Sequence, residues 1–492
     1  MGIKAAGPNE IPAEALKGNI NTTVEMLCHL FGKIWEKETM PADWKEGHLI
    51  KIPKKGDLSK CNNYRGITLP SVPGKVFNRI ILERIKDGVD QQLRDYQAGF
   101  RKERSCTDQI ATSRIILEQS IEWNSPLYIC FVDYEKAFDS LDRNTLWNLL
   151  RNYGVPQKIV SLIKNSNSEM KCRVVHEGRL TESFKVKTGV RQGCLLSLFL
   201  FLLAIDWKMK VTTQGKGNGI QWTLWSQLDD LDFADDLGLL SHKHQQMQDK
   251  VNVLQETSRK VGLNIHKGKT KLLKINSNFE GPVIIENKAL EEVDSFRYLG
   301  SIVDKLGGTD EDVRIRIGRA RAAFLQLKNI WSSKEISKAT KLRLFNTNTK
   351  SVLLYGAETW RTTKTVNRKI QIFVNSCLRK ILKIHWPETI SNTELWQCTN
   401  QRPMEEEILR RRWEWLGHTL RKPTSSITRQ ALTWNPQGKR RQGRPRNTWR
   451  RELDANIKEL GMGWPTIVKE AQDRRRWHAV VNGLCSRRSE GL

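Results

Sequence analysis

The run "LDDLDFADDLGLL" at residues 228–240 gathers five aspartates within eight positions of an otherwise apolar stretch. Asp235 and Asp236 need an explanation, because two adjacent carboxylates between apolar strands repel each other and lose hydration. A bound cation relieves both costs, and Mg²⁺ prefers carboxylate oxygens combined with the phosphates of a substrate. Acidic runs are otherwise usually solvated surface. We expect this of the other three aspartates, Asp229, Asp230 and Asp232.

A third acid, Asp133, directly follows the continuously apolar run "LYICFV" at residues 127–132. Such a run is typical of a strand that is buried on both faces. If this strand and the aspartate run are neighbours in one sheet, Asp133 joins Asp235 and Asp236, and three carboxylates can hold two Mg²⁺ ions. Two ions about 3.5 to 4 Å apart activate an attacking hydroxyl and stabilise a leaving pyrophosphate. From spacing alone, such a metal site and an ordinary acidic surface remain open alternatives.

The surrounding sequence predicts elements that would hold these acids in place. The aspartate run fits a β-hairpin, with "LDDLDF" and "LGLL" as its strands and Asp235 and Asp236 at its tip. After Asp133, Asp142 is a suitable N-cap for an amphipathic helix that ends at Gly154. The three acids are therefore expected at the ends of neighbouring strands.

Strands and helices alternate up to about residue 305, after which the pattern is helical. Residues 190–205, "VRQGCLLSLFLFLLAI", predict a glycine-containing loop that enters a buried helix. Thr309, with Asp312 three positions later, indicates a capping box at a helix N-terminus. Helical patterning continues to about residue 384, so the architecture changes in kind near residue 305.

The composition points to a polyanionic partner. The 492 residues include 82 Lys and Arg against 54 Asp and Glu, a formal net charge of +28, and the pI is near 9.8. The longest apolar run, at residues 194–205, is too short to cross a bilayer, which favours nucleic acid over a membrane. Nine cysteines without a C-x-x-C pair indicate reduced, intracellular thiols. The gaps between Cys377, His385, Cys398 and His418 match no usual zinc-ligand spacing.

The basic character is concentrated at the C-terminal end. The last 83 residues, from Arg410, carry 20 Lys or Arg against 7 Asp or Glu, and six of the 17 tryptophans. Residues 439–451, "KRRQGRPRNTWRR", contain seven basic residues in thirteen. Their core, "GRPR" at residues 443–446, could lie extended in a narrow minor groove, although a solvated basic loop is the simpler interpretation. The tryptophans could stack on unpaired bases or form a helical core, and both can hold.

Several motifs resemble, in order, the motif series of reverse transcriptases. They are "FVDYEKAFDSLDR" (131–143), "GVRQGCLLS" (189–197), "FADD" (233–236), "GLNIHKGKTK" (262–271) and "FRYLG" (296–300). Upstream, "IPKKGD", "NYRGITL" and "QAGFRKERSCTDQI" are similar to the fingers motifs of non-LTR retrotransposon enzymes. Downstream, "SVLLYGAETWRTTK" and "ALTWNPQGKRRQGRPRNTWRREL" resemble the tail of the RTE clade. The resemblance covers nearly the whole chain, and five motifs in one order are far more specific than any single one.

The resemblance implies an α+β right-hand polymerase with fingers, palm and thumb, an antiparallel palm sheet, and a basic C-terminal helical domain. The expected boundaries are residues 1–305 for fingers and palm, 306–384 for the helical thumb and 385–492 for the nucleic-acid-binding region. The implied activity is RNA-directed DNA polymerisation for target-primed reverse transcription of a LINE-type element. It would use an RNA template, a DNA primer or target, deoxynucleotides (dNTPs) and two Mg²⁺ ions, for which Mn²⁺ could substitute. Such an enzyme is expected in the nucleus and cytoplasm as a ribonucleoprotein.

The resemblance also implies a role for each matching residue. Asp133, Asp235 and Asp236 would be the catalytic, metal-binding carboxylates, and Phe138 a steric gate against a ribose 2′-hydroxyl. Further dNTP contacts are expected from Lys54, Arg65, Gln192, Gly193 and Lys269. The primer grip would comprise Tyr298, Leu299 and Gly300. Nucleic-acid contacts in the tail would come from Arg440, Arg441, Arg444, Arg446, Arg450 and Arg451.

Two departures from the family pattern and two rival interpretations accompany this prediction. Leu198 stands where the family usually has proline, which removes preorganisation but no functional group. Elements of this clade carry an apurinic-type endonuclease ahead of the polymerase, and nothing before residue 7 could be one, so target nicking is expected from elsewhere. The rivals are a catalytically decayed nucleic-acid-binding remnant and an RNA-directed RNA polymerase. Retention of all three acids disfavours the first, and Phe138 disfavours the second.

Overall fold

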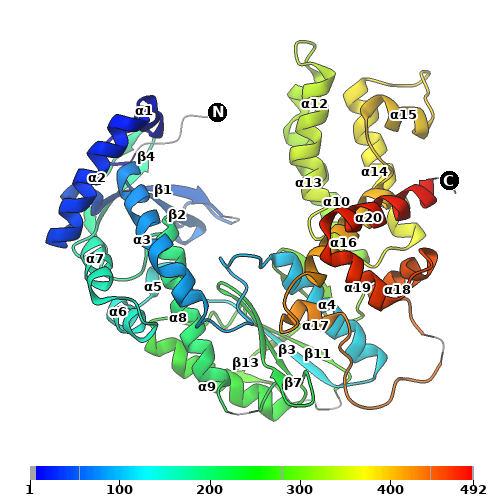
Figure 1. Cartoon of the computed structure of the whole chain (residues 1–492), viewed down its shortest axis with the longest axis horizontal. Helices are drawn as coiled ribbons and strands as arrows, with labels where there is room; N and C mark the ends of the chain where they lie inside the picture. The colour runs from blue at the N-terminus through cyan, green and yellow to red at the C-terminus, as the bar shows by residue number, and fades with distance from the viewer. Residues whose placement is uncertain are drawn as a thin grey trace.

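Two arms rise from a common base in the computed structural model of the chain (Figure 1). The structure describes residues 7–54, 56–215, 217–277, 279, 281–443 and 445–489. The first arm is formed by N-terminal elements, and the second by helices that follow residue 309. The base between them contains the central sheet, to which the predicted acids belong.

The central sheet has five strands in the order β14-β11-β3-β10-β9. Its strands are β3 (Leu127–Val132), β9 (Asp230–Phe233), β10 (Asp236–Ser241), β11 (Lys271–Ile275) and β14 (Glu291–Glu292). The four strands from β11 to β9 are antiparallel to their neighbours, as the resemblance implies for this sheet, whereas β14 pairs with β11 in parallel. The strand predicted at residues 127–132 and the hairpin predicted at residues 228–240 are therefore both confirmed.

Alternate residues of β3 enter two different apolar cores. Tyr128, Cys130 and Val132 face the core formed with helices α8 (Leu195–Thr213) and α9 (His244–Lys260). Residues of the opposite face, such as Ile129 and Phe131, pack with α4 (Cys106–Glu122) and the C-terminal helices. Helices on both sides thus hold the sheet, and the expectation of a strand buried on both faces is confirmed.

The first arm contains a second sheet, with strand order β2-β1-β4-β5 and β6 paired to β4. Its strands are β1 (Glu46–Pro53), β2 (Tyr64–Leu69), β4 (Lys171–His176), β5 (Arg179–Leu180) and β6 (Phe184–Lys185). Its helices are α1 (Ala13–Gly18), α2 (Ile20–Lys37), α3 (Val72–Asp90), α5 (Ala137–Ser140), α6 (Arg143–Asn152) and α7 (Gln157–Asn167). Asp142 caps α6 by accepting a hydrogen bond from Thr145 N at 2.7 Å, as predicted.

Three pairs of short strands accompany the two larger sheets among the described residues. They are β7 (Ile220–Gln221) with β8 (Gln227–Leu228), β12 (Ile284–Ile285) with β13 (Lys288–Ala289), and β15 (Ser295–Tyr298) with β16 (Ser301–Asp304), and the last pair leads into the helices of the second arm. The arm's helices are α10 (Asp310–Gln326), α11 (Lys328–Ser332), α12 (Lys338–Leu344), α13 (Ser351–Leu353), α14 (Lys364–Leu382) and α15 (Asn392–Thr399). A third apolar core joins these helices around Phe345, Trp360 and Leu378.

The predicted capping box at Thr309 is wrong. The Thr309 hydroxyl donates to the Arg361 carbonyl at 2.7 Å and makes no cap contact with α10. Asp312 is buried and accepts hydrogen bonds from Ile302 N at 3.0 Å and from Arg114 Nη2 at 2.8 Å. Both side chains that the local pattern assigned to the N-terminus of α10 therefore bond instead to residues outside this helix.

Five helices form the C-terminal part of the chain and pack against α4. They are α16 (Met404–Leu420), α17 (Ile427–Ala431), α18 (Trp449–Glu459), α19 (Trp464–Gln472) and α20 (Arg474–Ser489). Trp413 stacks on Trp477 with ring centroids 5.5 Å apart, and Trp449 is also buried. These tryptophans are thus core residues, as one of the two interpretations predicted, and not exposed rings available to stack on bases. No helix among the described residues is sufficiently long and apolar to traverse a lipid bilayer.

Candidate active site

The structure brings the three predicted acids to one end of the central sheet. In the β9–β10 hairpin, Asp236 pairs with Phe233, so Ala234 and Asp235 form the two-residue tip. The prediction that Asp236 also lies at the tip is wrong, because Asp236 is the first residue of β10. On the other side of β10, Leu237 pairs with Val132, the last residue of β3, and Asp133 follows directly. The expectation that the two strands are neighbours in one sheet is confirmed.

The pKa values show that these acids repel one another. Burial and then the charge of Asp133 raise the pKa of Asp235, against the opposing effects of Arg65 and Lys208. Burial, followed by the charges of Asp235 and Asp133, raises the pKa of Asp236 to about 6. Because Asp236 is exposed to solvent, we attribute its raised pKa mainly to repulsion by the other two acids. Such a group of acids gains from any cation that binds among them.

A cavity of about 690 Å³ opens in front of the acids. Besides Asp133 and Asp235, its lining includes five predicted site residues, namely Lys54, Arg65, Phe138, Gln192 and Lys269. Lys54 follows β1, Arg65 lies in β2, Phe138 lies in α5, and the other two precede α8 and β11, so the five residues are far apart in the sequence. The cavity joins a wall of basic side chains to the acids, an arrangement suited to a triphosphate with bound metal.

Local contacts fix two of these lining residues. The Phe138 ring stacks on Phe201 of the buried helix α8, with centroids 4.3 Å apart. The Gln192 carbonyl accepts a hydrogen bond from Thr68 N at 2.8 Å. Gly193, at φ +116°, leaves no room for a side chain, because a Cβ there would lie 2.6 Å from the Thr68 carbonyl oxygen. The loop before α8 is thereby held against β2.

Lys269 is placed directly on one of the acids. Its Nζ lies 3.2 Å from Asp133 Oδ2, an oxygen that is buried and has no hydrogen bond within the described residues. Three carboxylates fit the hard-oxygen preference of Mg²⁺. In the part of the chain that the structure describes, however, no three His, Cys, Asp or Glu side chains are grouped as a metal site. The donor chemistry fits, while the present side-chain positions correspond to an ion pair with Lys269.

The expectation that Asp229, Asp230 and Asp232 are solvated surface is wrong. Asp230 and Asp232 are completely buried, and the Arg94 guanidinium donates to them at 2.7 Å and 2.6 Å. Asp229 forms an ion pair with the buried Lys250 at 2.9 Å. The sequence pattern could not reveal these pairs, because Arg94 lies 136 residues before Asp230.

Gln97 is a second residue that the sequence did not single out. Its buried Oε1 accepts hydrogen bonds from Ala234 N at 2.9 Å and from Gly99 N at 2.8 Å. Ala234 has φ +56°, a left-handed conformation that is strained for a residue with a side chain. Gln97 thus holds the tip that carries Asp235. Its position in the motif "QAGF" was the available signal.

The predicted primer grip is a turn that lies under the hairpin. The Tyr298 hydroxyl donates to the Leu231 carbonyl at 2.7 Å, and the side chains of Tyr298 and Leu299 are both buried. The Tyr355 hydroxyl donates to the Leu299 carbonyl at 2.9 Å, and Arg319 donates to the Gly300 carbonyl at 3.2 Å. A ligand that reaches this turn would therefore meet its backbone rather than these two side chains.

The basic tail residues fall into three groups. Arg440 and Arg451 form ion pairs with Glu122, and Arg450 donates to the Trp434 carbonyl at 2.6 Å. Arg441 and Arg446 are exposed, and among the described residues no ion pair involves their side chains. Arg444 lies outside the described residues.

The family comparison agrees with this geometry. The family described as reverse transcriptase (RNA-dependent DNA polymerase) matches residues 52–303, about half of the chain. The chain therefore belongs to the reverse transcriptase family, and the class of enzyme that the family defines is RNA-directed DNA polymerase. A second match, to a domain of unknown function (DUF6451), covers residues 323–355.

The curated relatives to which this chain is similar include proteins of retrotransposable elements. The Pol polyprotein of the type-2 retrotransposable element R2DM of Drosophila melanogaster is 26% identical over 53% of this chain and 25% of that protein. The R2 Pol polyprotein of Popillia japonica is 26% identical over 71% of this chain and 49% of its own length. The probable RNA-directed DNA polymerase of the X-element of Drosophila melanogaster is 24% identical over 80% and 43%. The chain thus spans a quarter to a half of these relatives. Among solved structures, Candida tropicalis telomerase with a fragment of telomeric RNA has a TM-score of 0.40, with 13% identity over 82% of this chain and 67% of that one.

Proposed function

We propose that this chain polymerises DNA on an RNA template for a non-LTR retrotransposon of the RTE-like clade, by target-primed reverse transcription. One observation carries the proposal: Asp133, Asp235 and Asp236 meet at one sheet end, beside a cavity with a basic wall. The substrates are an RNA template, a DNA primer or target, and dNTPs. The protein then acts as a ribonucleoprotein in the nucleus and cytoplasm.

In this proposal Asp133, Asp235 and Asp236 hold two Mg²⁺ ions, or Mn²⁺ ions in their place. When bound, the ions activate the primer 3′-hydroxyl and stabilise the leaving pyrophosphate. Lys269 lies beside the acids, with its Nζ 3.2 Å from Asp133, and would supply a cation to the phosphates of the nucleotide. Its long side chain would reach these phosphates without a change in the backbone.

The remaining cavity residues orient the nucleotide. Arg65 offers a planar fork of donors to the triphosphate, and Lys54 adds a point charge beside it. Phe138, held by Phe201, closes the space that a ribose 2′-hydroxyl would need. Gln192 and Gly193 contact the base pair between the incoming nucleotide and the template. Gly193 has no side chain, so the backbone of this loop can lie close to the base pair. In this scheme the turn at residues 298–300 contacts the primer through its backbone.

The alternative of a decayed nucleic-acid-binding remnant is less well supported. A copy without selection for catalysis has no reason to keep three acids whose mutual repulsion costs stability. Those acids and the cavity wall opposite them are both present.

Primer extension tests the proposal directly. Purified protein is expected to extend a DNA primer on an RNA template with Mg²⁺ and dNTPs, and Asp235→Asn is expected to lower the rate by on the order of a hundredfold to a thousandfold. Asp294→Asn is the matched control, because the Asp294 side chain is 81% exposed and pairs with Lys305 in a surface contact. Equal extension by both variants would assign the chemistry to other residues. Binding without extension by the unaltered protein would favour the remnant.

A further inference from the structure

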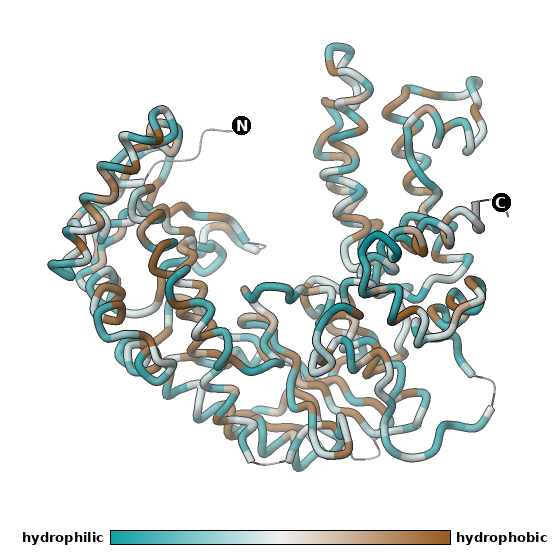
Figure 2. The backbone as a smooth tube through the Cα atoms, viewed as in Figure 1, coloured by the Kyte–Doolittle hydropathy of each residue, from teal (hydrophilic) through white to brown (hydrophobic). Residues whose placement is uncertain are grey.

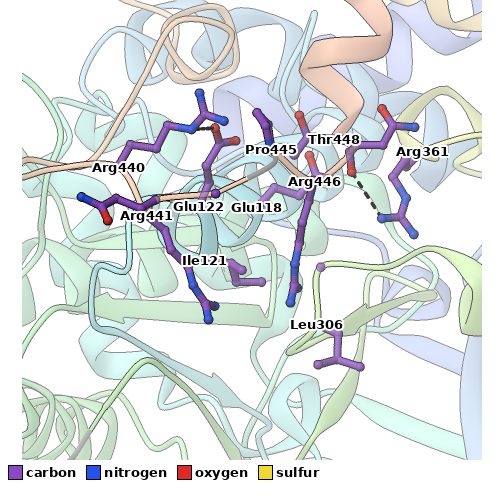
Figure 3. A pocket seen from close by; sticks show the side chains of 14 residues that line it. Glu118, Ile121, Glu122, Leu306, Arg361, Arg440, Arg441, Pro445, Arg446 and Thr448 are labelled. Carbon is purple, nitrogen blue, oxygen red and sulfur yellow. Dashed lines mark hydrogen bonds and ion pairs between the residues drawn. The ribbon is translucent and has the colours of Figure 1, made fainter.

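A second pocket, of about 280 Å³, lies between the end of α4 and the loop before α18 (Figure 3). The end of α4 contributes Glu118, Ile121 and Glu122, and the loop contributes residues 440–443 and 445–448. Leu306, Gly307 and Arg361 complete the lining. Figure 2 shows that the loop is largely hydrophilic. The proposed polymerase function does not use this pocket.

The loop that forms the pocket is anchored rather than loose. Glu122 Oε1 lies 2.6 Å from Arg440 Nε and also pairs with Arg451, while its carbonyl accepts from Arg441 N at 3.0 Å. Thr448 caps α18 by accepting from Arg451 N at 3.3 Å. One acid of α4 thus holds both ends of the basic segment, so the pocket exists before any ligand binds.

Three arginines in the pocket retain unused donors. The side chains of Arg441 and Arg446 flank Ile121 and extend toward the side on which Leu306 lies (Figure 3). Neither has an ion-pair partner within the described residues. Arg361 donates to the Asn447 carbonyl at 3.3 Å and pairs with Asp310 at 3.4 Å, while its buried Nε has no hydrogen-bond partner in the described part of the chain. The pocket therefore has apolar side chains beside two exposed guanidinium groups, those of Arg441 and Arg446, that form no ion pair among the described residues.

From this geometry we infer that the pocket binds one unpaired nucleotide of a single-stranded nucleic acid, with its base against Ile121 and Leu306 and its phosphates on Arg441 and Arg446. Planar guanidinium groups stack on bases and pair with phosphate oxygens, whereas duplex bases are already stacked and cannot enter. A volume of about 280 Å³ suits a single nucleotide rather than a helix.

This site is distinct from the catalytic cavity. Glu122 ends α4, which precedes β3, whereas Asp133 follows the other end of β3. Six strand residues separate the two ends by roughly 20 Å. The inference deepens the proposed function and rests on it for the source of the strand, which is either template RNA or displaced target DNA. The shared chemistry is an unpaired nucleotide with its phosphates.

Binding of short labelled strands by the full chain tests the site. The probes are one sequence as single-stranded RNA, as single-stranded DNA and as a DNA duplex, each measured by fluorescence anisotropy at several salt concentrations. Arg441→Ala with Arg446→Ala is expected to weaken binding of a single strand about tenfold and to reduce the salt slope by about 1.4. Leu306→Ala is expected to weaken binding a few-fold without changing the slope, because it removes contact area and no charge.

The matched control is Arg475→Ala with Arg476→Ala, which removes the same charge from exposed residues of α20. The inference requires that this control affects single strands and duplex alike, whereas the pocket variant affects single strands selectively. Photocrosslinking of a 4-thiouridine strand is expected to label residues 440–448. Equal effects of the two double variants on all three strands, or crosslinks confined to other segments, would overturn the inference.

The two proposals can fail separately. Loss of primer extension in the unaltered protein with retained pocket crosslinks would remove the polymerase function and leave the binding site. Extension that persists while the pocket variant binds all strands like the control would remove the site and leave the polymerase. A larger effect on RNA than on DNA assigns the pocket to the template, and the reverse assigns it to the target.

Discussion

The two halves of one aspartate run are built in opposite ways. Asp230 and Asp232 are buried on β9 around the Arg94 guanidinium, at 2.7 Å and 2.6 Å. A few residues later, Asp235 lines a cavity and Asp236 is exposed, and neither has a guanidinium at hydrogen-bond distance among the described residues. The first pair is structural. In the second pair, more distant cations compensate the repulsion only in part, which favours the binding of a metal cation.

The comparison shows that a pKa raised by burial does not distinguish the structural acids from the functional ones in this run. Burial and the charge of Asp230 raise the pKa of Asp232 well above its usual value, and Arg94 opposes this shift. Burial also raises the pKa of Asp235 and Asp236. The distinction lies in the partner, since a fixed guanidinium compensates only the first pair. Removing Arg94 should therefore lower the stability of the protein, whereas removing the charge of Asp236 should raise it.

The largest effect is expected from removing the partner. Arg94→Met would leave Asp230, Asp232 and Asp206 buried without their shared cation, which should lower the free energy of unfolding by about 3–5 kcal/mol. Urea unfolding followed by tryptophan fluorescence measures this loss. Arg94→Lys keeps the positive charge but loses the forked donors of the guanidinium. Its free energy of unfolding should lie between those of the unaltered protein and Arg94→Met. A change within about 1 kcal/mol for Arg94→Met would show that the cluster is not held by this residue.

Glu118 provides a buried acid whose charge is poorly compensated. Burial raises its pKa to about 7, and the charge of Glu452 adds slightly to this shift. The hydrogen bond from Trp449 N at 3.0 Å and the charges of Arg361 and Arg114 lower the pKa but do not offset burial. The unfolded chain loses this proton near pH 4.5 and the folded chain near pH 7, so stability falls as the pH rises between these values. The loss amounts to about 3 kcal/mol.

Glu118→Gln should remove this pH dependence, so its stability relative to the unaltered protein increases from pH 5 to pH 8. Unfolding by urea at each pH measures the difference, with the exposed Glu335→Gln as the control. A difference between Glu118→Gln and the unaltered protein that stays constant over this range would contradict the assignment of the raised pKa.

Substitution of Gln97 tests whether a residue outside the aspartate run positions the hairpin tip that carries Asp235. Gln97→Met would leave Ala234 N and Gly99 N without their acceptor, at a cost of about 2 kcal/mol. We expect kcat to fall while the KM for dNTPs stays unchanged, because the nucleotide contacts are elsewhere. Adding Ala234→Gly should restore part of kcat, since glycine adopts φ +56° without strain. Failure of this rescue, with normal folding, would limit Gln97 to a structural role.

The sequence predicted those features that depend on local pattern. The strand at residues 127–132, the hairpin around Asp235 and the cap at Asp142 follow from periodicity and residue type within short windows. The roles of Asp230 and Asp232 could not be predicted, because their partner Arg94 comes from a segment that only tertiary folding brings near. The same reason explains the error at Thr309, whose hydroxyl donates to Arg361. Seven of the site residues taken from the motifs line one cavity, because motifs that share a ligand occur together in the folded family, whatever their separation in the sequence.

The smallest change in stability, and the sharpest test of the comparison, is expected from Asp236→Asn. Removing one of the repelling charges should raise the free energy of unfolding by about 1 kcal/mol, a value discounted because the residue is exposed to solvent. Asp230→Asn, in contrast, weakens a buried ion pair and should lower stability. Primer extension should fall in Asp236→Asn despite its greater stability, because the lost charge is the one that attracts the metal. If both substitutions destabilise the protein, the second pair is compensated as well, and the run is structural throughout.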